Sequence, residues 1–346
     1  MHRLFILLSA VIVVGSGCER AVEPEWGYSP EVLELSGELQ TEVRSQVRER
    51  CGTYSQPKLL GHDDVTTDWL KHGQAVYKKR CVQCHGISGG GDGPAAAVMY
   101  PRPRDYRRGI FKFTSTTYGS KPLREDLVST LHRGIRGTSM PSFKLLPKKD
   151  IEAVVDYVLV LTHRGELENQ IALTAQAEEE VDPEVVEEDL VPIVVDAWKQ
   201  AIQNEVHVLT PQPEFTKANV VNGKKAFLTR GCSKCHGEDG RGLTADNLKA
   251  GLKDTWQQPT RAADLTSGML HGGQEPIDVY RRIYAGINGT PMPGFANVLK
   301  DEPDTIWDLV AYVLYVSNRR RVGDNPPPGP PAPYVPVAET SVEAGG

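Results

Sequence analysis

Two segments of the chain carry apolar residues at the spacing of an amphipathic helix. Positions i, i+3, i+4, i+7 and i+8 are apolar within both 150–161 and 305–316, which predicts two helices whose apolar stripes face a core. The stripe residues are Ile151, Val154, Val155, Val158 and Leu159 in the first segment, and Ile306, Leu309, Val310, Val313 and Leu314 in the second.

Further helical spacing precedes each of these segments. Residues 68–79 and 217–229 are predicted to be helices, and their Gly73 and Gly223 would let another helix backbone come close. A helix is also expected in 193–202, behind Pro192, and another near the N-terminus. No run shows the alternation and turns of a hairpin, so we expect a mainly α fold. The helix near the N-terminus is predicted from the spacing of four apolar residues, Val32, Leu35, Leu39 and Val43.

The two stripes end two copies of one repeat. Each copy has a glycine and an aromatic residue, then two cysteines and a histidine, then a methionine loop, and then the stripe. Cys81 corresponds to Cys232 and Met140 to Met292, at offsets of 151 and 152 residues. The chain therefore contains two homologous modules in tandem.

Composition and charge divide the rest of the chain. Residues 71–164 hold 17 Lys and Arg against 7 Asp and Glu, whereas 165–213 hold 1 against 12. We assign the following regions: a signal peptide at 1–18, an N-terminal extension with a helix at 19–69, the first module at 70–164, an acidic connector with a helix at 165–213, the second module at 214–321, and a disordered Pro-rich tail at 322–346.

The N-terminus has the pattern of an export signal. Arg3 precedes an apolar run that is too short to span a membrane comfortably, and small residues lead to Cys18. We expect a periplasmic protein anchored by a lipid at Cys18, with plain cleavage or an uncleaved anchor as alternatives. Nucleic acid is not an expected partner, because the basic residues lie in an exported chain without a recognition motif.

The sequences "RCVQCHG" and "RGCSKCHG" contain the attachment signature of c-type haem. The two thiols form thioethers with the haem vinyl groups, and the histidine that follows is the axial ligand. A thioredoxin-like dithiol lacks its βαβ context here, and a zinc site made of four cysteines normally has more closely spaced pairs. We therefore predict two covalently bound haem c groups, one at Cys81, Cys84 and His85, and the other at Cys232, Cys235 and His236.

Met140 and Met292 are the methionines related by the repeat, within "GTSMPSF" and "GTPMPGF". A thioether opposite a histidine favours Fe(II) and raises the reduction potential. We predict that both are axial ligands, whereas core methionines are the alternative. Bis-histidine ligation is not favoured, because His132 corresponds to Tyr284.

Each module resembles a class I, mitochondrial-type cytochrome c domain. The resemblance covers about 70–164 and 216–320 and rests on C-x-x-C-H, the G-x-x-G-T-x-M-P-x-F loop and a terminal helix. It implies that the two terminal helices of each domain cross over one haem edge. The segment "YPRPRDYRRGIFKF" further resembles dihaem subunits beside bacterial respiratory oxidases and alternative complex III, which implies that Arg104 lies near haem propionates. Arg261 is its weaker analogue, and a solvated surface arginine is the alternative for both.

Six strong iron ligands leave no position for a substrate. We therefore expect electron transfer between a quinol-oxidising complex and a terminal oxidase, or between other cytochromes, rather than catalysis. A dihaem peroxidase or another haem enzyme is the alternative function. Both a mobile carrier and a subunit of a larger complex are compatible with the sequence.

Overall fold

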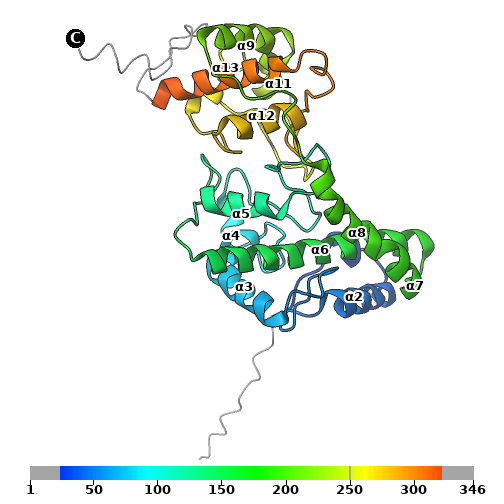
Figure 1. Cartoon of the computed structure of the whole chain (residues 1–346). Helices are drawn as coiled ribbons and strands as arrows, with labels where there is room; N and C mark the ends of the chain where they lie inside the picture. Colours follow the sequence, from blue (N-terminus) through cyan, green and yellow to red (C-terminus); the bar gives the residue numbers. More distant parts are fainter. Residues whose placement is uncertain (1–23, 249–250, 322–346) are drawn as a thin grey trace, which may run out of the picture.

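The computed structural model describes residues 24–248 and 251–321, which form helices, turns and loops (Figure 1). Within that described part, no β-strand forms, and β-type pairing is limited to isolated bridges. The mainly α fold predicted from sequence is confirmed. The helices are α1 Pro30–Leu33, α2 Gly37–Cys51, α3 Thr67–Arg80, α4 Val82–His85, η1 Ala96–Val98, α5 Arg124–Arg133, α6 Lys148–Glu178, α7 Pro183–Val185, η2 Val186–Leu190, α8 Val191–Lys199, η3 Gln200–Asn204, α9 Lys217–Thr229, α10 Cys232–His236, α11 Ala245–Leu248, η4 Leu265–Ser267, α12 Pro276–Ala285 and α13 Asp304–Arg321.

In the first module, α3 crosses α6 at very short distance. Thr66 begins α3 as an N-cap whose hydroxyl accepts from the Trp69 amide. At the crossing, a Cβ on Gly73 would lie 2.0 Å from the carbonyl oxygen of Ala153. The close approach inferred from Gly73 is therefore present, and the contact admits no side chain at this position.

The second module repeats this crossing with α9 and α13. A Cβ on Gly223 would lie 1.9 Å from the carbonyl oxygen of Asp308. The helices α5 and α12, which the sequence pattern did not predict, occupy equivalent places in the two modules. Asp126 and Asp278 each accept a hydrogen bond from the N-cap amide three residues earlier, and a glycine with positive φ ends each helix.

Helix α6 continues past residue 164, where the sequence pattern ends the first module. Its C-terminal part packs with α1, α2, η2 and α8 around a separate apolar core, and we call this group of helices the cap (Figure 1). The core of the cap contains Val43, Val47, Leu167, Ile171 and Val194. The described part of the N-terminal extension and much of the acidic connector thus form one structural unit.

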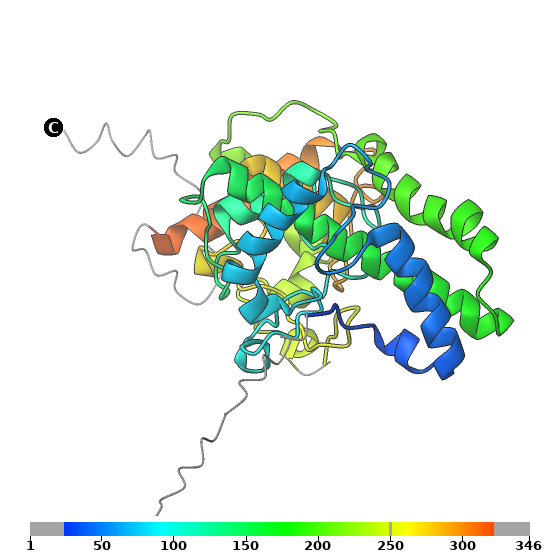
Figure 2. The same cartoon turned by 90° about the horizontal axis from the view of Figure 1, so that it is seen from below.

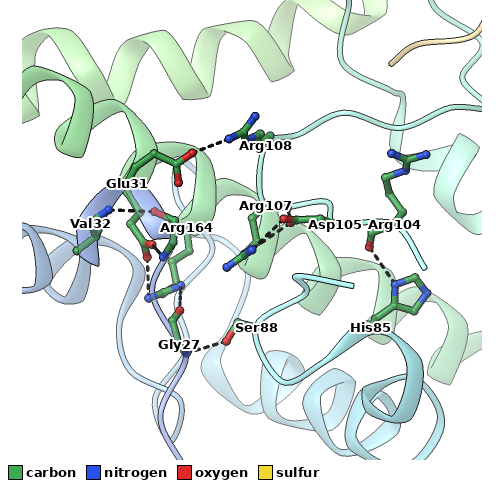
Figure 3. A network of polar contacts seen from close by, with 12 residues as sticks. Gly27, Glu31, Val32, His85, Ser88, Arg104, Asp105, Arg107, Arg108 and Arg164 are labelled. Carbon is green, nitrogen blue, oxygen red and sulfur yellow. Dashed lines mark hydrogen bonds and ion pairs between the residues drawn. The ribbon is translucent and has the colours of Figure 1, made fainter. Parts of the chain in front are cut away.

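The cap also buries charge. Arg164 and Glu168 pair at 2.9 Å with side chains that are 2% and 1% exposed, and Glu168 accepts a hydrogen bond from the Ser29 amide. Gly27 donates to the hydroxyl of Ser88, which follows the first Cys-His motif (Figure 3). The extension is therefore bound directly to the first module.

The connector is fixed to the first module before it enters the second. The Val206 amide donates to the Ser115 carbonyl, and the Thr117 amide donates to the Asn204 carbonyl. The modules also contact each other directly, because the Gly119 amide donates to Asn288 at 2.9 Å. The two modules and the cap consequently have a defined arrangement (Figures 1 and 2).

The signal peptide with Cys18 and the Pro-rich tail lie outside the described residues. Of the helices that are described, none is both long and apolar enough to cross a membrane.

Replacing Gly73 by alanine tests the helix crossing. The added Cβ has backbone as its nearest neighbour, so the helices must separate, and we expect the free energy of unfolding to fall by about 1–3 kcal/mol or more. Urea denaturation of the haem-loaded protein measures this change. Gly37→Ala is the matched control, because nothing lies within 4 Å of a Cβ at that helical glycine. Equal stability of the two variants would contradict the proposed steric role.

The buried His163 should make stability depend on pH. Burial lowers its pKa from 6.5 to about 3, while Nδ1 lies 3.2 Å from the Leu60 carbonyl oxygen. The folded protein keeps this imidazole neutral while the unfolded chain protonates, so stability present above pH 6.5 is lost as the pH falls toward 3. The loss approaches about 1.4 kcal/mol per pH unit for one proton.

Urea denaturation between pH 7 and pH 4 measures this contribution. His163→Gln should reduce the slope of unfolding free energy against pH, since its amide can still donate to Leu60 but does not titrate. Exposed His207→Gln is the control and should leave the slope unchanged. An unchanged slope in the His163 variant would exclude the assignment.

Candidate functional site

The first Cys-His motif follows directly from the end of α3. The Cys81 amide donates to the Tyr77 carbonyl at 2.8 Å, and the His85 amide donates to the Cys81 carbonyl at 2.9 Å. Cys81 therefore lies between α3 and the single turn α4, which carries Cys84 and His85. In the second module α10 has the same role for Cys232, Cys235 and His236.

The four motif cysteines are half-buried and form no disulfide. Burial raises the pKa of the Cys81 thiol to about 12 and that of Cys232 to about 11, so these thiols are neutral near pH 7. The two pairs lie in separate modules. Among the residues described, no three His, Cys, Asp or Glu side chains gather into a candidate metal cluster.

Both motif histidines have the same orientation. Nδ1 of His85 lies 3.2 Å from the Arg104 carbonyl oxygen, and Nδ1 of His236 lies 3.0 Å from the Ala263 carbonyl oxygen (Figure 3). Because a carbonyl only accepts, Nδ1 carries the proton and Nε2 keeps its lone pair. Burial lowers the pKa of both histidines, which further favours the neutral ring. Each ring is therefore prepared to bind a metal through Nε2.

The carbonyl contacts also align the two modules. The residue of the second module that corresponds to Arg104 is Ala263, which lies two residues after Arg261. Arg261 is exposed, whereas the Arg104 side chain is only 19% exposed and reaches the second module. The sequence analogy between Arg104 and Arg261 is thus displaced by two residues in the structure.

The two methionine loops have one fold. The Met140 amide donates to the Thr138 hydroxyl at 3.2 Å, and the Met140 carbonyl accepts from the Ile135 amide at 3.1 Å. The corresponding bonds in the second loop, from Met292 to Thr290 and from Ile287 to Met292, measure 3.3 and 3.2 Å. Both methionines are half-buried. The repeated phrase G-T-x-M therefore specifies a repeated backbone conformation.

A haem fits this donor set. Each module offers two unpaired thiols, an imidazole with a free Nε2 and a half-buried thioether, which are the attachment and axial groups of haem c. Nε1 of Trp256 is buried and has no hydrogen-bond partner among the described residues, so this N–H group could donate to a bound group. Sequence reasoning missed Trp256 and Ala263, since neither belongs to a repeated phrase.

Comparisons with known proteins agree with this geometry. The family model described as Cytochrome c matches residues 70–162 and 220–317, which together exceed half of the chain. A solved structure from Kuenenia stuttgartiensis, described as a reducing HAO-like protein complex, contains a chain that is 32% identical. The match covers 71% of this chain and 96% of that chain, with a TM-score of 0.56. The comparison with curated proteins finds no match.

The family match falls on the two repeated modules, and each match contains a complete Cys-His turn and a methionine loop. Family members bind haem c covalently and transfer electrons. This chain therefore belongs to the cytochrome c family.

Proposed function

We propose that this protein carries two haem c groups and transfers single electrons within a bacterial respiratory chain. Cys81 and Cys84 would attach the first group, between His85 and Met140. Cys232, Cys235, His236 and Met292 would hold the second. The observation that supports this most strongly is the identical hydrogen-bonding of histidine and methionine loop in both modules.

Haem, when bound, supplies an iron that changes between Fe(III) and Fe(II) by one electron. The protein contributes an imidazole that is oriented by a carbonyl and kept neutral by burial. It also contributes a methionine whose backbone amide is held by a threonine hydroxyl. Both modules offer a methionine in the same loop, so neither is built differently to admit a substrate. We therefore propose electron transfer for both modules and do not favour a peroxidase.

Two observations support proposals for the electron-transfer partners of this protein. The similar Kuenenia chain comes from a multi-protein complex, which favours a role as a cytochrome subunit of a larger oxidoreductase. The segment around Arg104 resembles oxidase-linked dihaem subunits, which favours electrons arriving from a quinol-oxidising complex and leaving toward a terminal oxidase. We further propose export to the periplasm, with anchoring through a lipid at Cys18.

Substitution of the methionines tests the haem sites. Met140→Ala should keep two haems per chain but lower one reduction potential by more than the roughly 59 mV of a tenfold change, because the soft ligand for Fe(II) is lost. Met292→Ala should lower the other potential. Redox titration with pyridine haemochrome analysis measures both quantities, and cyanide should bind rapidly only at the altered haem.

The double variant Cys81→Ala with Cys84→Ala is a control for haem content and should retain one covalent haem. Cyanide or peroxide uptake by the unaltered protein would instead favour a haem enzyme. Two haems with no change of potential in either methionine variant would exclude methionine ligation.

Capture of the tagged protein from solubilised membranes tests its partner. A complex subunit should retain its partners at about 0.5 M salt, where the screening length is only a few ångströms. A carrier whose basic first module docks electrostatically should be released under this condition. Identification of the retained proteins distinguishes an HAO-like oxidoreductase from quinol-oxidising and oxidase complexes, and recovery of no respiratory protein at low salt would contradict the proposal.

A further inference from the structure

The backbone and the side chain of Arg104 contact different parts of the protein. Its carbonyl accepts from the candidate ligand His85, while its guanidinium points away from that ring (Figure 3). The guanidinium carbon lies 3.5 Å from the ring centroid of Trp256, and Nη1 lies 3.7 Å from a carboxylate oxygen of Asp254. Since these partners belong to the second module, one residue connects the first candidate haem site to the neighbouring module.

The receiving residues are themselves held in place. Oδ1 of Asp254 accepts from the amides of Trp256 and Gln258, both at 3.0 Å, which leaves Oδ2 directed at Arg104. Asp254 is 8% exposed, so its charge is poorly screened by water. A cation stacked on an aromatic face beside a buried carboxylate is a well-defined binding arrangement.

Trp256 continues this connection to the second methionine loop. The adjacent Thr255 amide donates to the Gly289 carbonyl at 3.0 Å, and a Cβ on Gly289 would lie 2.5 Å from the Trp256 ring. Gly289 begins the G-T-P-M phrase whose Thr290 hydroxyl accepts from the Met292 amide. Contacts therefore extend without interruption from His85 to the loop that carries Met292.

The second module has no arginine at the place that corresponds to Arg104. In the second module the carbonyl that holds His236 belongs to Ala263, whose methyl group provides no charge and no reach. The repeat thus retains the backbone contact to the histidine but places a long cationic side chain only at the first site.

We propose that Arg104 is a positioning residue through which the docked second module, by Asp254 and Trp256, sets the reduction potential of the haem at His85. Lys112 adds to the same charge cluster, with Nζ 3.9 Å from the Asp254 carboxylate. The Asp254 carboxylate therefore faces two largely buried cations, whose side chains are 19% and 21% exposed. Burial lowers the pKa of Arg104 to about 10, and burial together with the neighbouring Arg104 charge lowers that of Lys112 to about 8.

The proposal rests on the proposed haem sites. It predicts the direction in which each substitution shifts the reduction potential of the first haem. Oxidised iron carries one more positive charge than reduced iron. Loss of the Asp254 charge therefore favours the reduced form of the first haem, whereas loss of the Arg104 charge favours the oxidised form. A merely structural loosening of the contact would shift both variants in the same direction.

Redox titration of the holoprotein tests these signs, with the two haems assigned through the methionine variants. Asp254→Asn should raise the ratio of reduced to oxidised first haem several-fold at a fixed ambient potential, and Arg104→Gln should lower it. The second haem should change less in both variants. Exposed Asp189→Asn in η2 is the matched control and should leave both ratios unchanged.

Combined and conservative variants determine whether Asp254 acts through Arg104. In the Arg104→Gln background, Asp254→Asn should have a smaller effect than in the native chain. Asp254→Glu and Trp256→Phe should retain most of the native ratio, because they keep the charge and the aromatic face. Additive effects, equal shifts of both haems or an unchanged first haem would overturn the proposal.

Pyridine haemochrome analysis separates the two levels of inference. Two haems per chain in the Asp254 variant, together with an unchanged first ratio, would reject the coupling alone. Fewer than two haems in the unaltered chain would instead reject the proposed haem sites.

Discussion

The close crossing of α3 on α6, and of α9 on α13, is the constraint on which the rest of each module depends. The Cys-His turn begins where α3 or α9 ends, and the methionine loop stops shortly before α6 or α13 begins. Because Gly73 and Gly223 admit no Cβ, the backbones of the two helices are in direct contact at each crossing. The groups that would attach and ligate a haem are therefore fixed by a backbone contact outside the site itself.

The sequence predicted the parts of the fold that depend on repetition and apolar spacing. Stripes such as that beginning at Ile151, the paired glycines and the Cys-His and methionine phrases each occur twice, so one copy supports the interpretation of the other. The cap escaped this reasoning because residues 163–168 are mostly polar yet buried. Arg164 and Glu168 pair with each other across a helical turn, and they also contact Gly27 and Ser29, which are distant in sequence.

The contacts between the modules were beyond sequence reasoning for a different reason. The motif around Arg104 predicts a position near haem propionates, but nothing in the sequence indicates that its side chain meets Trp256 of the second module. The offset between Arg104 and Ala263 likewise became visible only through the carbonyl contacts to the two histidines. Repeats reveal what two modules share, whereas the interface depends on the residues in which they differ.

Electron transfer between two modules of the same fold gains a preferred site when the surroundings of the two sites differ. If both sites had the same surroundings, the two potentials would be similar and electrons would have no preferred station. The fold supplies a difference by placing the first module between the cap and the second module, with Arg104 contacting the latter. The connector is tied to Ser115 and Thr117 before it enters the second module, which limits independent movement of the two units. A fixed interface can therefore tune one site by charges from its neighbour, which two freely linked modules could not do.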